Sequence, residues 1–189
     1  MIESFLMSLG IVALAEMGDK TQLLALVLAA RFRKPMPIIL GILVATLLNH
    51  GVAGALGAWL MHTIGPQWMR WILGGSFLAM AGWILVPDKL DDAQAEQKGG
   101  VFLTTVIAFF LAEMGDKTQF ATVALAAQYT SLTAVVLGTT FGMMVANVPA
   151  VLLGDRVTRL VPMRTVHLIA AGLFVILGLM ALFNVGSLL

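Results

Sequence analysis

One polar octapeptide occurs twice in this chain, each time inside a long apolar stretch. Its sequence is Ala-Glu-Met-Gly-Asp-Lys-Thr-Gln, and the two copies are 97 residues apart. In a helix, residues three apart share a face, so each copy presents a pair of carboxylates: Glu16 with Asp19, and Glu113 with Asp116. Charged groups in apolar surroundings must meet each other, an ion or water. The octapeptides therefore hold the candidate functional residues.

The donor atoms of these residues favour a hard divalent cation. Carboxylate, amide, hydroxyl and carbonyl oxygens suit Ca²⁺, Mn²⁺ or Mg²⁺ rather than Cu⁺ or Zn²⁺. Four carboxylates and two lysines give a formal charge of −2, which one divalent cation would neutralise. When the cation leaves, burial favours protonated carboxylates, so proton uptake would empty the site. We therefore expect cation/proton exchange, with Glu16, Asp19, Glu113 and Asp116 as the metal ligands.

Other polar residues and the motif glycines have predicted supporting roles. Gly18 and Gly115 permit close backbone approach or a helix break that frees carbonyl groups. We expect Lys20 and Lys117 to be counter-charges rather than ligands, because an ammonium group only donates hydrogen bonds. The neutral side chains expected to support the site are Thr21, Gln22, Thr118, Gln119, Asn49, His50 and Asn147. For the last three, hydrogen bonding between helices stays open as the alternative.

A simpler interpretation makes each motif glutamate an internal salt-bridge partner of the lysine four residues later. That interpretation leaves Asp19 and Asp116 without a role. It also gives no reason for a purely structural pair to be duplicated at the same depth in both halves of the chain. We therefore prefer the cation site.

Composition indicates an integral membrane protein. Charged residues make up 11% of the 189 residues, against about a quarter in soluble domains, and hydrophobic residues make up 60%. The mean hydropathy is +0.98. The net charge of +1, without a basic groove, argues against nucleic acid as a partner. The absence of cysteine excludes disulfides and thiolate metal sites, and we expect no prosthetic group.

Charges, prolines and glycines divide the chain into apolar segments long enough to cross a bilayer as helices, which takes about 20 residues. We therefore expect an all-α integral membrane protein with six transmembrane helices. The expected spans are Phe5–Ala30, Pro37–Met61, Trp68–Val86, Val101–Ala127, Leu132–Leu153 and Met163–Val185. A polar linker, 87–100, separates a first three-helix repeat, 1–86, from a second, 101–189; together they are expected to form one transport domain.

The two three-helix repeats are a duplication with expected inverted topology. An ungapped shift of 97 residues superimposes the octapeptides and also places Gly41 on Gly138 and Phe77 on Phe174. Because each half has an odd number of spans, the second half must enter the membrane from the opposite side. Such inverted repeats are typical of secondary transporters, with the site near the middle of the membrane.

Lysine and arginine in the loops predict the orientation. Arg70 is alone on one side of the expected topology, and the other side has eight basic residues: Arg31, Arg33, Lys34, Lys89, Lys98, Arg156, Arg159 and Arg164. The basic side is expected to be cytoplasmic. The chain is thus expected to be a multi-pass protein of the cell inner (plasma) membrane with both termini on the outer side.

The doubled Glu-x-Gly-Asp-Lys-Thr motif resembles the E-x-G-D cation transporter family over essentially the whole chain. That family has a vertebrate Golgi member linked to glycosylation and bacterial members that include manganese exporters, and this compact chain is similar to the bacterial form. The resemblance implies export of Mn²⁺, or of Ca²⁺ in some members, in exchange for protons. It also implies that the motif carboxylates, Glu16, Asp19, Glu113 and Asp116, are the ligands.

Two other functional classes stay open. A cation channel, or an exporter of small organic cations, would also need intramembrane carboxylates, but channels usually build their filters from symmetric subunits. An intramembrane aspartyl protease would use two acids on one water, and it has no need for two lysines and two glutamates in matched copies. The sequence leaves the oligomeric state and the proton stoichiometry open.

Overall fold

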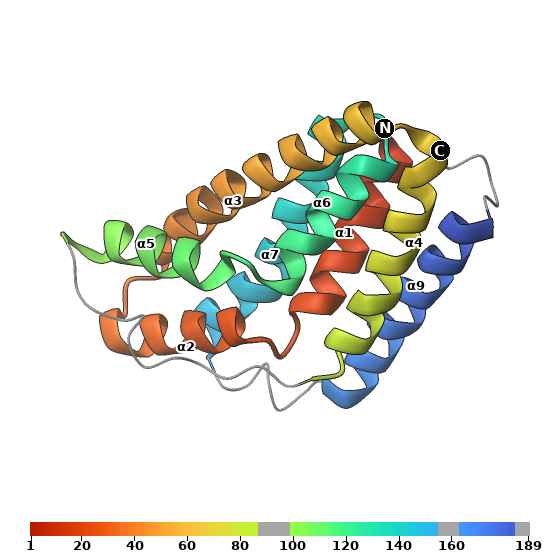
Figure 1. The fold of residues 1–189 in the computed structure, drawn as a ribbon. Coiled ribbons are helices and arrows are strands. Elements are labelled where there is room, and N and C mark those ends of the chain that lie inside the picture. Colours follow the sequence, from red (N-terminus) through yellow and green to blue (C-terminus); the bar gives the residue numbers. More distant parts are fainter. Residues whose placement is uncertain (87–98, 155–162, 184–189) are drawn as a thin grey trace.

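The computed structural model describes residues 1–86, 99–154 and 163–183, and within these ranges every regular element is a helix (Figure 1). The described helices are α1 (Ile2–Glu16), α2 (Lys20–Phe32), α3 (Pro35–Ile64), α4 (Pro66–Trp83), α5 (Val101–Glu113), α6 (Lys117–Gln128), α7 (Leu132–Leu153) and α9 (Met163–Phe183). The predicted all-α fold is thus confirmed for the described residues. The linker expected at 87–100 lies outside them except for its last two residues.

The first expected span of each half is interrupted at its octapeptide. In the first half, α1 ends at Glu16 and α2 begins at Lys20. In the second half, α5 ends at Glu113 and α6 begins at Lys117. The intervening Gly18 and Gly115 have φ angles of 81° and 77°. A residue with a side chain reaches this left-handed region only at a cost of about 1–2 kcal/mol. We refer to residues 17–19 and 114–116 as the two breaks.

The other expected spans differ from the observed helices mainly at their ends. α7 has the expected bounds, α3 and α4 begin earlier than expected, and the expected end of the last span at Val185 lies outside the described residues. By length and hydropathy, three described helices can cross a membrane: α3, α7 and α9 from Arg164 onward. The interrupted helices are individually too short for that.

The two halves pack against each other in equivalent ways. α1 packs along α7, and its counterpart α5 packs along α3. A Cβ atom placed on Gly41 would lie 2.7 Å from Thr105 Cβ, and one placed on Gly138 would lie 2.9 Å from Ser8 Cβ. Ser8 and Thr105 are themselves equivalent under the 97-residue shift. Glycine at both positions therefore lets a long helix approach the first helix of the other half closely.

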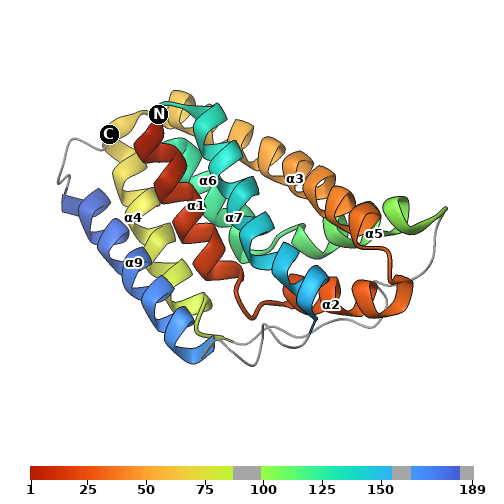
Figure 2. The same ribbon diagram turned by 180° about the vertical axis from the view of Figure 1, so that it is seen from behind.

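Two apolar cores are formed by different sets of helices, whose arrangement Figures 1 and 2 show. One core is formed mainly by α1, α4, α6 and α9, and the other by α2, α3, α5 and α7. In the first core, α4 and α9 pack as a pair in which the equivalent residues Phe77 and Phe174 are fully buried, with ring centroids 6.2 Å apart. The α4/α9 pair thus lies on the α1 and α6 side of the molecule, and α2 and α5 lie on the other side.

Candidate functional site

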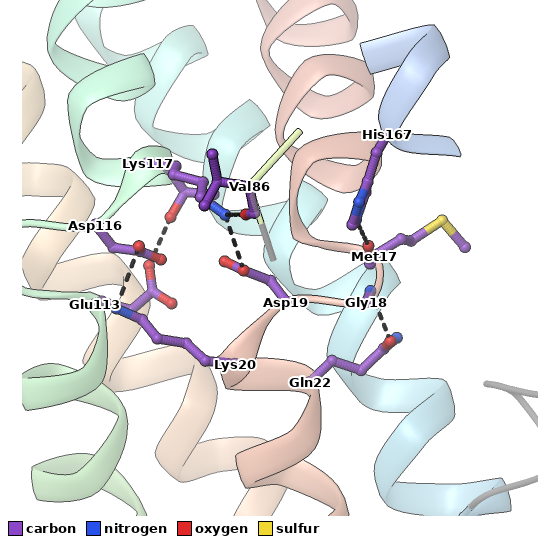
Figure 3. Close-up of polar contacts among 11 residues, drawn as sticks. Met17, Gly18, Asp19, Lys20, Gln22, Val86, Glu113, Asp116, Lys117 and His167 are labelled. Carbon is purple, nitrogen blue, oxygen red and sulfur yellow. Dashed lines mark hydrogen bonds and ion pairs between the residues drawn. The ribbon is translucent and has the colours of Figure 1, made fainter. Parts of the chain in front are cut away.

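Ion pairs between the two octapeptides join the breaks (Figure 3). Lys20 Nζ lies 3.2 Å from Asp116 Oδ1, and Lys117 Nζ lies 3.3 Å from Asp19 Oδ1. Each lysine therefore pairs with the aspartate of the other copy, although the sequence places it four residues from the glutamate of its own copy. These are contacts between the halves, which the simpler interpretation of salt bridges within one helix did not include.

The carboxylates of both octapeptides are buried. Glu16 and Glu113 are 0% exposed, and Asp19 and Asp116 are 3% and 2% exposed. Within the described part of the chain, Glu16 Oε2, Glu113 Oε1 and Asp116 Oδ2 are buried and accept no hydrogen bond. A buried carboxylate oxygen without a donor is costly, so each of these atoms needs a proton, a cation or a water molecule as its partner. Glu16 and Glu113 also end α1 and α5, where the partial negative charge of a helix C-terminus favours a cation.

The four carboxylates do not surround one point in this conformation. Across residues 1–86, 99–154 and 163–183, no group of three or more His, Asp or Glu side chains is arranged to hold a metal ion. The two aspartates are instead held by the lysines. A cation would therefore have to displace the ammonium groups before it gained all four carboxylates as ligands.

Gln22 and Gln119 connect each break to the long helix of the other half. Gln22 Oε1 accepts a hydrogen bond from the Gly18 N–H at 2.9 Å, and Gln22 Nε2 donates to the Ala146 carbonyl at 2.9 Å. Gln119 Oε1 accepts from the Gly115 N–H at 2.7 Å, and its Nε2 lies 3.5 Å from Asn49 Oδ1. The glutamine oxygens thus satisfy backbone donors that the helix interruptions leave exposed.

The remaining polar residues predicted to support the site lie at different distances from it. Thr118 Oγ1 donates to Glu113 Oε2 at 2.7 Å, and Asn147 Nδ2 lies 3.4 Å from Glu16 Oε1. Thr21 is fully buried at the start of α2. The Asn49 amide also donates to the Phe110 carbonyl at 3.0 Å. His50 is buried, and neither ring nitrogen has a hydrogen-bond partner among the described residues, so the structure does not join it to a motif carboxylate.

Sequence comparison identifies the family. The profile of the divalent cation/proton antiporter GDT1 family matches residues 4–92 and, separately, 101–187. The chain belongs to this GDT1 family. The resemblance expected from the doubled motif is therefore confirmed, and the match to each half agrees with a duplication.

Relatives of this GDT1 chain occur in bacteria and plants. A Vibrio cholerae serotype O1 protein named "putative manganese exporter" is 50% identical over 177 residues. The match covers 93% of this chain and 88% of the Vibrio protein. The Arabidopsis thaliana GDT1-like protein 5 is 27% identical over 221 residues, 96% of each chain. The Oryza sativa subsp. indica GDT1-like protein 3 is 26% identical over 200 residues, 92% of this chain and 71% of its own. No solved structure matches the chain.

Membership of the GDT1 family makes the chain a transporter rather than an enzyme. The expectation of a transporter is confirmed, and the aspartyl protease alternative is set aside. The apolar helices and the family together also indicate a multi-pass membrane protein.

Two contacts at the breaks were not predicted from the sequence (Figure 3). His167 of α9 has Nε2 2.6 Å from the Met17 carbonyl oxygen, and Lys117 Nζ lies 3.2 Å from the Val86 carbonyl oxygen just after α4. One signal in the sequence pointed to His167: the 97-residue shift places it on Arg70, so both halves carry a basic side chain near the start of their last helix. The Val86 contact has no such signal, because it involves a backbone carbonyl.

Proposed function

We propose that this GDT1 antiporter exports Mn²⁺ from the cell in exchange for protons, at one site between the two breaks. The observation that carries the proposal is the set of buried carboxylate oxygens without donors beside two ion pairs that join the halves. The proposed metal-ligand atoms are all oxygens, which suit Mn²⁺ and Ca²⁺. The printed name of the Vibrio relative favours Mn²⁺ as the cargo.

Charge balance suggests how the site is emptied and filled. In the empty site, Lys20 and Lys117 neutralise the two aspartates, and protons on Glu16 and Glu113 neutralise the rest. In the loaded site, a divalent cation and the two lysines balance four ionised carboxylates. Both states are then neutral, which avoids an uncompensated charge in a desolvated site. The proposed exchange is therefore two protons for each divalent cation, and it moves no net charge.

The proposed architecture is six spans in two inverted repeats, 1–86 and 101–189, joined by a cytoplasmic linker at 87–100. In it, α1 with α2 and α5 with α6 are interrupted spans, and α4 completes the six. The equivalent close approaches at Gly41 and Gly138 support the repeat, as does the family match to each half. Interrupted spans that meet near the membrane midplane are typical of transporter sites.

The proposed orientation has the termini outside and the plasma membrane as the location. Opposite ends of α3 differ in a way that supports it. Lys34 caps the start of α3, next to Arg33, whereas the exposed Trp59 lies near its end and the exposed Trp68 and Trp71 follow in α4. Basic residues favour the cytoplasmic side, whereas tryptophans gather at both membrane interfaces and mark only where α3 ends and α4 begins at one of them. Four basic residues used to predict the orientation, Lys89, Lys98, Arg156 and Arg159, lie outside the described residues.

Transport by the purified protein in proteoliposomes tests this proposal. We expect Mn²⁺ to move against its own concentration gradient when the compartment that receives it is made the more acidic one. This movement should stop when the pH gradient is collapsed. Parallel measurements with Ca²⁺ establish the cation preference. Mn²⁺ flux that follows its own gradient and ignores the pH gradient would instead favour the channel alternative.

A further inference from the structure

The α4/α9 pair contacts the breaks through one of its two ends. The two helices run antiparallel, because Gly74 lies against Leu182 while Phe77 lies against Phe174. The start of α9 and the end of α4 are therefore at the same end of the pair. From that end, His167 reaches the Met17 carbonyl and the Val86 carbonyl accepts from Lys117. A carbonyl oxygen only accepts, so His167 Nε2 carries the hydrogen of the first bond.

The equivalent contacts at the opposite end of the pair are not formed. The 97-residue shift places Arg70 on His167 and Met114 on Met17. Arg70 instead lies over the ring of Trp71, with Cζ 5.2 Å from the ring centroid, and its buried Nε has no hydrogen-bond partner among the described residues. The structure is therefore asymmetric in how the α4/α9 pair meets two otherwise matching breaks.

An inverted repeat makes this asymmetry informative. If both halves have the same local structure, the conformation in which they exchange roles has similar internal contacts and is accessible at similar energy. In that conformation the α4/α9 pair lies toward α5 and α2, and the start of α4 faces the second break. Arg70 then occupies the place beside Met114 that His167 now occupies beside Met17.

We propose that His167 and Arg70 are alternating positioning residues for transport, an inference that rests on the proposed inverted-repeat exchanger. His167 holds the Met17 carbonyl in the conformation described here, and Arg70 holds the Met114 carbonyl in the opposite-facing one. Each carbonyl belongs to a helix interruption next to the cation ligands. While held, the carbonyl is directed to the α4/α9 pair; once released, it is an additional oxygen available to the cation.

Pairs of introduced cysteines test the exchange of contacts, since the chain contains no cysteine of its own. The first pair is Met17→Cys with His167→Cys, and the second is Met114→Cys with Arg70→Cys. Treated with a short bifunctional thiol reagent in proteoliposomes, the first pair should cross-link without Mn²⁺. The second pair should cross-link as well. When the Mn²⁺ and pH gradients are reversed, the cross-linking yields of the two pairs should change in opposite directions.

A matched control separates movement of the α4/α9 pair from random collision. Met17→Cys with Arg70→Cys combines one residue of each pair, and it should not cross-link under any gradient. Failure of the second pair to cross-link under every gradient, while the first pair does, would overturn the proposal. Cross-linking does not depend on which cation is carried. If both pairs cross-link in a protein that does not transport Mn²⁺, the result would contradict Mn²⁺ as the cargo and would still support the alternating contacts.

Substitutions at His167 test its role separately from folding. His167→Gln keeps an Nε2 donor and should retain transport. His167→Leu removes the donor, and the loss of one hydrogen bond should shift the balance of the two conformations by up to about tenfold, seen as a higher cross-linking yield of the second pair. Mn²⁺ affinity should be unchanged in His167→Gln and should not fall in His167→Leu, because the released Met17 carbonyl is then available to the cation. Equal behaviour of the two variants in cross-linking and flux would contradict the assigned hydrogen bond.

Discussion

The Lys20 ammonium group lies 3.2 Å from the Asp116 carboxylate, so a cation from one half of the chain is paired with an anion from the other. Lys117 and Asp19 form the reciprocal pair at 3.3 Å. The lysines thus bind carboxylates that the proposed mechanism assigns to the metal. In the proposed mechanism, the ammonium groups take the place of the cation in the state that carries no cargo.

Removing both lysines should therefore separate binding from transport. In the Lys20→Gln, Lys117→Gln double variant, the site becomes more negative and no ammonium group competes for the aspartates, so Mn²⁺ affinity should be kept or increased. Mn²⁺ flux should fall, because release becomes slow. Affinity and flux measured on the same preparation check this, with the exposed Lys34→Gln as a control that changes neither. Loss of affinity in the double variant would show that the lysines assemble the site.

Alanine at either break should destabilise the protein. Gly18→Ala and Gly115→Ala place a side chain in the left-handed region at φ angles of 81° and 77°, at a cost of about 1–2 kcal/mol each. Gly10→Ala is the matched control, because Gly10 lies within α1 and a Cβ there would meet nothing within 4 Å. Thermal unfolding in detergent should show a lower unfolding temperature for Gly18→Ala and Gly115→Ala. The unfolding temperature of the Gly10→Ala control should not decrease. Unchanged unfolding of Gly18→Ala would argue against the break geometry.

The two glutamines beside the breaks should contribute unequally to stability. Gln22→Leu leaves the Gly18 N–H and the Ala146 carbonyl without this partner, and losing a buried partner costs about 1–3 kcal/mol. Gln119→Leu should cost less, since the Gln119 amide is 3.5 Å from Asn49 Oδ1. Unfolding of the two variants under identical conditions measures the difference. The reverse order would mean that the second break, and not the first, depends more on its glutamine.

Cysteine accessibility in intact cells tests the orientation. Glu3 and Thr63 are exposed and lie on the proposed outer side, whereas Lys34 is exposed on the proposed cytoplasmic side. An impermeant thiol reagent should label Glu3→Cys and Thr63→Cys in intact cells, and Lys34→Cys only after the membrane is permeabilised. Labelling with the opposite pattern would reverse the orientation and also the proposed direction of transport.

Local features of the site followed from the sequence because they depend on residues close in the chain. The duplication was visible as a repeated octapeptide, and glycine between Glu and Asp indicated where each helix could be interrupted. The ends of α7 followed from punctuation by polar residues around an apolar run. The prediction that Glu16 and Asp19 share one helix face was wrong, because the helix is interrupted between them.

Contacts between the halves could not be predicted from local spacing. Spacing makes Lys20 a neighbour of Glu16, and only the packing of α1 and α2 against α5 and α6 brings it to Asp116. The orientation of Gln22, with its oxygen on the Gly18 amide, likewise depends on the break conformation. The position of His167 depends on which side of the site the α4/α9 pair occupies, which is a property of one conformation and not of the sequence pattern.

The number of Mn²⁺ ions bound per chain tests the central claim, a single site shared by the two breaks. Titration of the purified protein should give one Mn²⁺ per chain, with protons released on binding. Asp19→Asn and Asp116→Asn belong to different halves, yet each should weaken that one site by more than about 100-fold, since even outer-shell partners of metal ligands are worth about 10- to 100-fold. Two Mn²⁺ per chain, with each variant losing one and keeping the other, would contradict the shared site.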